Sequence, residues 1–327
     1  MKIFKTTPQY QILGKKKIAF ILSGILMLAS IVGLLTKGLT YGIDFKGGTQ
    51  IQIKFNQEPE LETIRELFQK EVDTAVNITT FGEKEENEVI ITLSKEAIKG
   101  KTVELTELID DILKKKFSEF DIRRIETVGA KVGDELKTNG IEAALFVLIG
   151  ILIYVGFRFK MRYGVAAVVA LFHDVLITMG FFVFLEKEFT LTILAAILTI
   201  IGYSLNDTIV VFDRVRENIA RFPKRPMEEV INLSVNETLS RTILTALTTI
   251  LVVFALYILG GEIIRDFSFA MLIGLVVGTY SSIFVASPVV ILLEPSNLEK
   301  NQVYKKYNEI AEKLKQRFGK NKGKKAK

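Results

Sequence analysis

An aspartate lies within an apolar segment that is long enough to cross a membrane. Asp207, directly preceded by Asn206, interrupts the mostly hydrophobic run 189–212. Burial of an ionisable side chain at the centre of a bilayer is costly, so such a residue usually belongs to an ion pathway, a proton relay or a coupling site. The position of Asp207 therefore indicates a transporter or a motor subunit.

A second carboxylate is expected at a similar depth, beside the only histidine of the chain. His173 and Asp174 lie roughly ten residues inward from Arg162, and at about 1.5 Å per residue this places them near the middle of the bilayer. Histidine changes its charge near neutral pH and can relay protons. A neutral imidazole with a structural role is the alternative for His173, whereas Asp174 more strongly indicates function.

An arginine near the start of the segment 239–260 is a possible partner for Asp207. Arg241 shares a helix face with Thr245 and Thr248, and a buried arginine needs an anion. Asp207 lies about two turns inside its own segment, so antiparallel neighbouring helices would bring the two charges together. We hypothesise that Asp207 alternates between a protonated form and an Arg241-paired form; a permanent ion pair that fixes helix register is the alternative.

The composition indicates which elements position these residues. Hydrophobic residues make up 49% of the 327 residues and charged residues 24%, so the two kinds must be segregated along the chain. Each apolar run is close to the ~20 residues that cross a bilayer as a helix. The first run lacks a signal-peptide cleavage pattern and is interpreted as a retained anchor. The sequence predicts six transmembrane helices, at 18–36, 139–157, 163–185, 189–213, 239–260 and 267–293.

The distribution of lysine and arginine predicts the orientation. These residues concentrate in the N-terminus 1–17, the connection 158–162, the loop 214–238 and the tail 294–327. All four segments lie on one side if six helices alternate, so both termini are expected in the cytoplasm. The basic tail either binds anionic lipid or the ribosome or is simply solvated.

Charges of alternating sign mark the cytoplasmic end of the fourth predicted helix. Such a pattern usually forms a solvated face with ion pairs one turn apart. We therefore expect a hinge or docking role, rather than a chemical one, for Asp213, Arg214, Arg216 and Glu217. The chain has no cysteine and no zinc-binding or nucleophile motif. We predict no enzyme activity, no metal site and no cofactor, with protons as the coupling ion.

Residues 37–138 are predicted to form a soluble domain on the opposite side of the membrane. Alternating and helical periodicities follow one another in the order βαββαβ, which is typical of an α+β ferredoxin-like domain. Such a domain packs both helices on one face of its sheet. The other face is free for a partner or an extended peptide.

Glycines surround an aspartate at the start of this domain. Gly42, Gly47 and Gly48 flank Asp44, but the segment lacks the spacing and the lysine of a P-loop. We interpret it as a flexible joint between the first helix and the first strand, because glycine gives the backbone freedom to bend.

Four segments carry a resemblance to a known family. The chain resembles the SecF family of bacterial protein-export membrane proteins in the segments YGIDFKGGT at 41–49, GYSLNDTIVVFDRVREN at 202–218, LSRT at 239–242 and GTYSSIFVASP at 278–288. The match extends from the first to the sixth predicted helix, in order and with the expected spacing.

The resemblance implies a six-helix half-bundle of the RND superfamily in the bacterial cytoplasmic (inner) membrane. Such a subunit pairs with SecD, and often with YajC, beside the SecYEG channel. It uses the proton motive force to promote late translocation of a secreted precursor polypeptide. Within the family, the residues that match Asp207 and Arg241 belong to the proton pathway, and the pair that matches His173 and Asp174 also recurs.

An RND-type proton-driven exporter of lipids or small molecules is the alternative function. Such transporters usually carry both halves on one chain, with much larger extracytoplasmic domains. A purely structural assembly factor is a further alternative, and it would leave Asp207 and Arg241 replaceable by a well-packed neutral pair. An intramembrane enzyme is disfavoured because the chain lacks its motifs.

Overall fold

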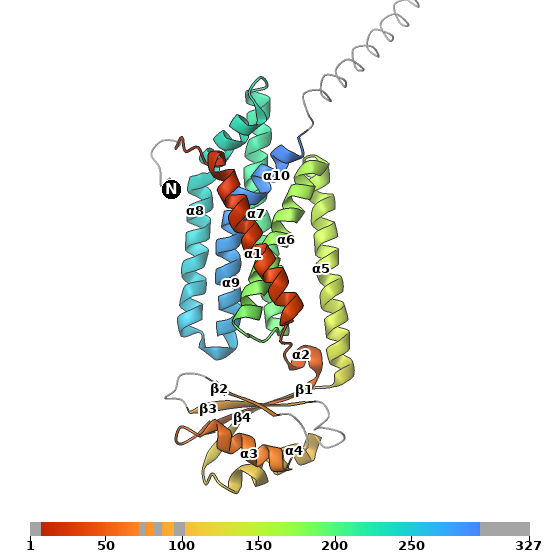
Figure 1. Ribbon diagram of the computed structural model, residues 1–327, viewed down its shortest axis with the longest axis vertical. Coiled ribbons are helices and arrows are strands. Elements are labelled where there is room, and N and C mark those ends of the chain that lie inside the picture. Colours follow the sequence, from red (N-terminus) through yellow and green to blue (C-terminus); the bar gives the residue numbers. More distant parts are fainter. Residues whose placement is uncertain (1–7, 72–75, 82–86, 95–101, 295–327) are drawn as a thin grey trace, which may run out of the picture.

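A helical bundle and a small α+β domain make up the molecule (Figure 1). The computed structural model describes residues 8–71, 76–81, 87–94 and 102–294. In this part of the chain, six helices are long and apolar enough to cross a membrane, which confirms the number of predicted spans. The bundle contains α1 (Lys16–Thr36), α5 (Ala130–Arg158), α6 (Met161–Phe184), α7 (Leu191–Arg221), α8 (Met227–Leu259) and α9 (Gly261–Ser281).

The chain continues beyond α9 without leaving the bundle. A π-helical segment, η4 (Ser282–Ala286), and a short helix, α10 (Ser287–Leu292), complete the sixth span. A single turn, η1 (Leu13–Lys15), precedes α1. The described N-terminal segment and α10 lie at one end of the bundle, and the soluble domain lies at the other (Figure 1). The predicted basic tail, 294–327, lies outside the described residues except for Glu294.

Several helices extend beyond the predicted membrane segments. Helix α5, which contains the second predicted span, begins at Ala130 rather than at 139. Most of the expected loop 214–238 is helical, with only 222–226 between α7 and α8. Polar residues with good helix propensity prolong a helix that apolar packing has already formed. Apolar runs therefore locate the spans but not the helix ends.

Close packing brings α7 against α9. A Cβ atom on Gly274 would lie 2.3 Å from Cδ1 of Ile200, and one on Gly278 would lie 3.0 Å from Cβ of Ser204. Glycine lets the two backbones approach because it has no side chain. Helices α6 and α9 are the most buried of the bundle, and α5 and α8 are the least buried.

The soluble domain has the predicted order of elements after one additional short helix, α2. It contains α2 (Ile43–Lys46), β1 (Gly48–Phe55), α3 (Leu61–Glu71), β2 (Val76–Phe81), β3 (Glu88–Ser94), α4 (Thr102–Lys114) and β4 (Phe120–Val128). The four strands form an antiparallel sheet in the order β2-β3-β1-β4.

The two faces of this sheet have different surroundings. Ile51 and Ile53 of β1 are fully buried in one cluster with Ile64 and Phe68 of α3. Both α3 and α4 cover the face that points away from the bundle (Figure 1). The opposite face is polar, as the period-two alternation of β1 requires, and it faces the near ends of the bundle helices.

Candidate functional site

The first of two polar centres in the bundle is built on Asp174 of α6, which is 0% exposed. Its Oδ1 lies 2.9 Å from Nδ1 of His173. Its Oδ2 accepts hydrogen bonds from the hydroxyls of Ser204 and Ser281, at 2.6 and 2.8 Å. Helices α6, α7 and α9 therefore meet at a single carboxylate.

His173 extends this centre to α1. Its Nε2 lies 3.1 Å from Oγ of Ser23, which lies 3.1 Å from the hydroxyl of Tyr280. Tyr280 donates to the carbonyl of Ala19 at 2.9 Å. Ser23 then donates to Tyr280 and can only accept from His173. Nε2 of His173 therefore carries hydrogen, and one further proton lies between Nδ1 and Oδ1 of Asp174.

The second centre is built on Asp207 of α7, which is 8% exposed. Its Oδ1 accepts from the hydroxyl of Thr242 at 2.7 Å, and its Oδ2 accepts from the hydroxyl of Ser282 at 3.0 Å. Ser282 also lies within donating distance of the Thr279 carbonyl, at 3.0 Å. A hydroxyl can donate to a carboxylate or accept from a carboxylic acid by rotation of its O–H bond. This centre can therefore hold either protonation state without movement of heavy atoms.

Two consecutive serines connect the centres. Ser281 binds Asp174, and Ser282 binds Asp207. They lie where α9 ends and the π-helical segment η4 begins. Single π-helical turns inside longer helices occur frequently at functional sites. A change of register at η4 would therefore alter the donors of both carboxylates together.

The hypothesised ion pair between Asp207 and Arg241 is absent from the described contacts of this structure. Arg241 is exposed, whereas its neighbour Thr242 is buried and binds Asp207. Consecutive residues of an α-helix point about 100° apart, so α8 turns either Thr242 or Arg241 toward α7. Asn206 is likewise exposed beside the buried Asp207. Their places in a proton pathway stay predictions.

The charged motif at the end of α7 forms ion pairs with its surroundings. Arg214 binds Glu237 of α8 and Glu217 of its own helix, each at 2.7 Å. Asp213 binds Arg216 at 2.8 Å and lies 3.4 Å from Arg158 of α5. This network ties three helices together at the end opposite the soluble domain. A hinge or docking role for it stays a prediction.

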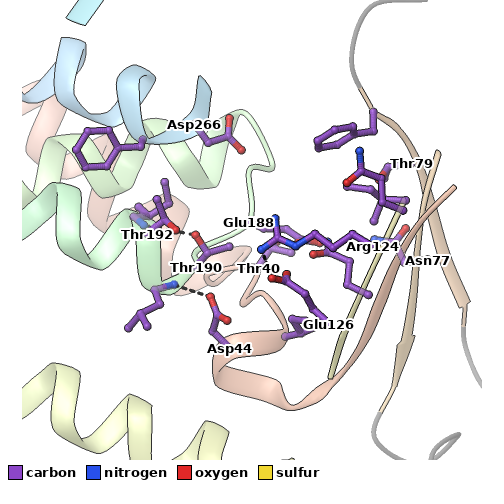
Figure 2. A pocket seen from close by; sticks show the side chains of 18 of the residues that line it. Thr40, Asp44, Asn77, Thr79, Arg124, Glu126, Glu188, Thr190, Thr192 and Asp266 are labelled. Carbon is purple, nitrogen blue, oxygen red and sulfur yellow. Dashed lines mark hydrogen bonds and ion pairs between the residues drawn. The ribbon is translucent and has the colours of Figure 1, made fainter. Parts of the chain in front are cut away.

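Asp44 lies at the junction of the soluble domain and the bundle. Its Oδ2 accepts a hydrogen bond from the backbone N–H of Leu191, the first residue of α7, at 2.8 Å (Figure 2). The backbone N–H of Gly42 donates to the Phe189 carbonyl at 3.0 Å, and the Phe189 N–H donates to the Thr40 carbonyl at 2.7 Å. The motif around Asp44 is therefore bound to the connection between α6 and α7.

The neighbouring glycines occupy tightly constrained positions. Gly47 and Gly48 have φ values of 72° and 148°, which side chains rarely permit. A Cβ on Gly48 would lie 2.5 Å from the carbonyl oxygen of Leu93, and one on Gly133 would lie 3.1 Å from the Gly47 nitrogen. In this structure these glycines permit close packing, and the bending of a flexible joint stays a prediction.

A polar groove of about 500 Å³ separates the open face of the sheet from the bundle (Figure 2). The sheet contributes Arg124 and Glu126, and the connection between α6 and α7 contributes Glu188. Burial raises the pKa of Glu188; Lys46 opposes this shift, while Asp266 and Asp44 add to it. Among the described residues, no group of histidine and carboxylate side chains is arranged to hold a metal ion.

Sequence reasoning missed the hydroxyl donors of both centres. Ser23, Thr242, Ser281 and Ser282 all contact a member of the two centres. Ser281 and Ser282 are adjacent in a mostly apolar span, and this pairing could have indicated that they bind buried polar groups. Thr242 could have been found from its position next to Arg241.

The fold and its two polar centres define a multi-pass membrane protein with ionisable groups inside the bundle. The family described as "Protein export membrane protein SecD/SecF, C-terminal" matches residues 108–296, and the SecD/SecF GG motif matches residues 32–59. The chain belongs to the SecD/SecF family.

Individual relatives support the same assignment. "Protein translocase subunit SecF" of Rhodothermus marinus is 46% identical over 301 residues, which cover 90% of this chain and 96% of the relative. The protein of the same name in Magnetococcus marinus is 44% identical over 303 residues, which cover 92% of this chain and 97% of the relative. These relatives are named as translocase subunits and not as enzymes, in agreement with the prediction.

A solved structure shares the fold. The crystal structure of SecDF from Thermus thermophilus, described as a translocon-associated membrane protein, matches with a TM-score of 0.80 and 36% identity. The match covers 89% of this chain but 39% of the SecDF chain. The chain therefore corresponds to one part of a longer protein in that relative.

Proposed function

We propose that this chain is the SecF-type subunit of a protein-export machinery, in which proton exchange at Asp207 promotes late translocation of secreted precursor polypeptides. One observation carries the proton-coupled part of this proposal. Asp207 lies near the bundle surface between two hydroxyls that can serve either of its protonation states. The SecF relatives, matched over nearly their full length, support protein export over lipid or small-molecule export.

The energetics of the proposed coupling are adequate. One elementary charge that moves down the membrane potential releases ~2.3 kcal/mol per 100 mV. A shift of a two-state equilibrium from 1:99 to 99:1 requires about 5.5 kcal/mol. Two or three protons in each cycle would therefore suffice to switch the conformation. Protons would be the coupling ion, with no resident cofactor.

A SecD-like partner would cover the exposed polar side chains of α7 and α8. Arg241 and Asn206 are exposed although they lie in membrane-spanning helices. An arginine in contact with lipid tails is costly, so a protein neighbour is expected on this face. The solved SecDF chain is longer than this one and joins this part to further sequence. The same partner could supply an anion to Arg241.

The remaining features of the proposal follow from charge and resemblance. The basic segments 1–17, 158–162 and 214–238 favour a cytoplasmic location for both termini in the bacterial inner membrane. The domain 37–138 then lies outside, and its order of elements and strands supports a ferredoxin-like fold. Association with SecYEG and YajC is proposed from the family resemblance.

Replacement of Asp207 by asparagine tests the proposed function. The complex of this chain with its SecD-like partner would be reconstituted in vesicles, and proton flux and late precursor translocation would be measured. Asp207→Asn keeps the size and the hydrogen-bonding groups but cannot ionise, so both rates should fall to the level without a proton gradient. Glu229→Gln, at an exposed carboxylate of α8, serves as the control. Unchanged rates in Asp207→Asn would reject the proposal.

A further inference from the structure

We propose that Asp44 is a positioning residue that fixes the soluble domain to α7, so that the domain and the helix bearing Asp207 move as one body. The inference rests on the proposed function, because it concerns how a shift of α7 reaches the outside of the membrane. It also differs from a flexible joint, in which the domain would swing relative to the bundle.

The carboxylate of Asp44 caps the first turn of α7, a helix far from it in the sequence. It accepts from the Leu191 N–H at 2.8 Å, across 147 positions of sequence. The first N–H groups of a helix have no partner within the helix, and an anion at this end is favoured by the helix dipole. The helix's own cap residue, Thr190, is engaged with Ile193 at 3.4 Å. Asp44 therefore stabilises α7 only while the domain is docked.

Backbone and aromatic contacts reinforce this attachment. Tyr41 and Phe189 form an isolated parallel bridge, held by the hydrogen bonds of Gly42 and Thr40 to Phe189. The rings of Phe45 and Phe189 stack at a centroid distance of 5.5 Å, and both side chains are buried. Opening of the attachment would expose this apolar pair as well as uncap the helix.

The chain around Asp44 has little room to bend. Helix α5 packs its Gly133 against the backbone of Phe45 and Gly47, where an added Cβ would lie 3.1 to 3.2 Å from the nearest atoms. On the other side, Gly48 packs against the carbonyl of Leu93 in β3. The short helix α2 is thus enclosed between α5, the sheet and the start of α7.

A continuous helix connects this attachment to the proton-exchanging centre. Asp207 lies 16 positions after Leu191 within α7, or about 24 Å along the axis. No proline interrupts α7. A tilt or translation that follows a change at Asp207 would therefore arrive at Asp44 as a rigid displacement, and the domain would follow it.

An engineered disulfide tests whether the attachment stays closed. The chain has no cysteine, so Tyr41→Cys with Phe189→Cys would introduce a single pair across the bridge. If the domain and α7 move together, the oxidised and reduced forms of this variant should export precursor at the same rate. Export that stops on oxidation and returns on reduction would overturn the proposal. The reduced form controls for the loss of the two rings.

Replacement of Asp44 tests its positioning role. Asp44→Ala removes the cap, whereas Asp44→Asn retains an acceptor and should restore most of the function. Loss of a cap should raise the undocked fraction about fivefold. Export should then fall while proton flux through Asp207 continues. The matched control is Glu66→Gln, at an exposed carboxylate of α3 on the far side of the domain. The Tyr41→Cys and Phe189→Cys pair would be added to each Asp44 variant. The rate at which its disulfide forms reports whether the domain is folded and docked.

The outcomes separate this inference from the proposed function. Equal export by Asp44→Ala and Glu66→Gln, alongside an inactive Asp207→Asn, would overturn the role of Asp44 and leave the proton-driven function intact. Unaltered export by Asp207→Asn would reject the function itself. Parallel loss of proton flux and export in Asp44→Ala would also contradict a coupling role, because it would place Asp44 in the proton pathway.

Discussion

The two carboxylate centres of the bundle differ in enclosure and in the chemistry of their partners. Asp174 is fully enclosed and binds a histidine and two serines from three helices. Asp207 is slightly exposed and accepts hydrogen bonds from two hydroxyls. A fully enclosed and completely hydrogen-bonded group exchanges protons with difficulty, whereas hydroxyls near the surface adapt to either state of a carboxylate. From this comparison we predict a fixed structural centre at Asp174 and an exchanging centre at Asp207.

The largest effect is expected from loss of the fixed centre. Asp174→Ala removes the carboxylate that contacts His173, Ser204 and Ser281, and of these Ser281 keeps the Gly278 carbonyl as an acceptor. Removal of one partner from a buried pair typically costs about 3–5 kcal/mol, so the bundle should lose most of its stability. Thermal unfolding in detergent would measure this loss. Asp207→Asn should unfold close to the parent temperature, and equal destabilisation by the two variants would contradict the division of roles.

A somewhat smaller effect is expected where α7 and α9 join the two centres. In Gly274→Ala the new methyl group would lie 2.3 Å from Ile200, so the helices must separate. Overpacking of this kind costs about 1–3 kcal/mol. Gly150→Ala in α5 is the control, because its added Cβ meets nothing within 4 Å. Similar unfolding temperatures for the two variants would show that the contact between α7 and α9 is loose.

Loss of one hydroxyl at the exchanging centre should have a moderate effect. Thr242→Val removes a donor to ionised Asp207, worth about 1 kcal/mol, and favours the protonated form. Proton-driven export should slow about fivefold, because proton release becomes harder. Thr245→Val is the matched control, since the Thr245 hydroxyl bonds only to carbonyls of its own helix. Equal rates for the two valine variants would remove Thr242 from the coupling.

A smaller effect is expected at Glu188, which lies outside both centres. Burial raises its pKa, so the docked domain binds this proton more tightly than the undocked one. Docking stability is then highest at acidic pH and declines as the pH rises through the raised pKa. Glu188→Gln should abolish this decline and stabilise docking at neutral pH. Rates of disulfide trapping across a pH series, corrected for the thiolate fraction, would measure docking in the parent and in Glu188→Gln. A pH dependence that persists in Glu188→Gln would contradict the expectation.

No change at all is expected for His173 during turnover. It is the only histidine of the chain, so nitrogen-15 labelling of histidine in a protein without a histidine tag gives a signal from one residue. Nuclear magnetic resonance should show the same protonation of the two ring nitrogens with and without a proton gradient. A ring whose protonation changes with the gradient would place His173 among the groups that exchange protons.

The sequence predicts the elements better than it predicts the contacts between them. Apolar runs locate the six spans, and the alternation between 49 and 128 predicts the order of strands and helices. The hypothesised pairing of Arg241 with Asp207 is not among the described contacts and stays a prediction, because a polar stripe can face a partner protein as well as its own bundle. Ser281 and Ser282 were missed because helix rotation and depth, which periodicity leaves open, decide which hydroxyl meets which carboxylate.

The most direct test of an exchanging Asp207 is infrared difference spectroscopy of the reconstituted complex. Spectra would be recorded with and without a proton gradient, with Asp207→Asn as the reference. Exchange predicts a protonated carboxyl band that appears and disappears with the gradient and is missing from the variant. A carboxylate band that stays constant in the parent protein during active export would contradict proton exchange at this residue.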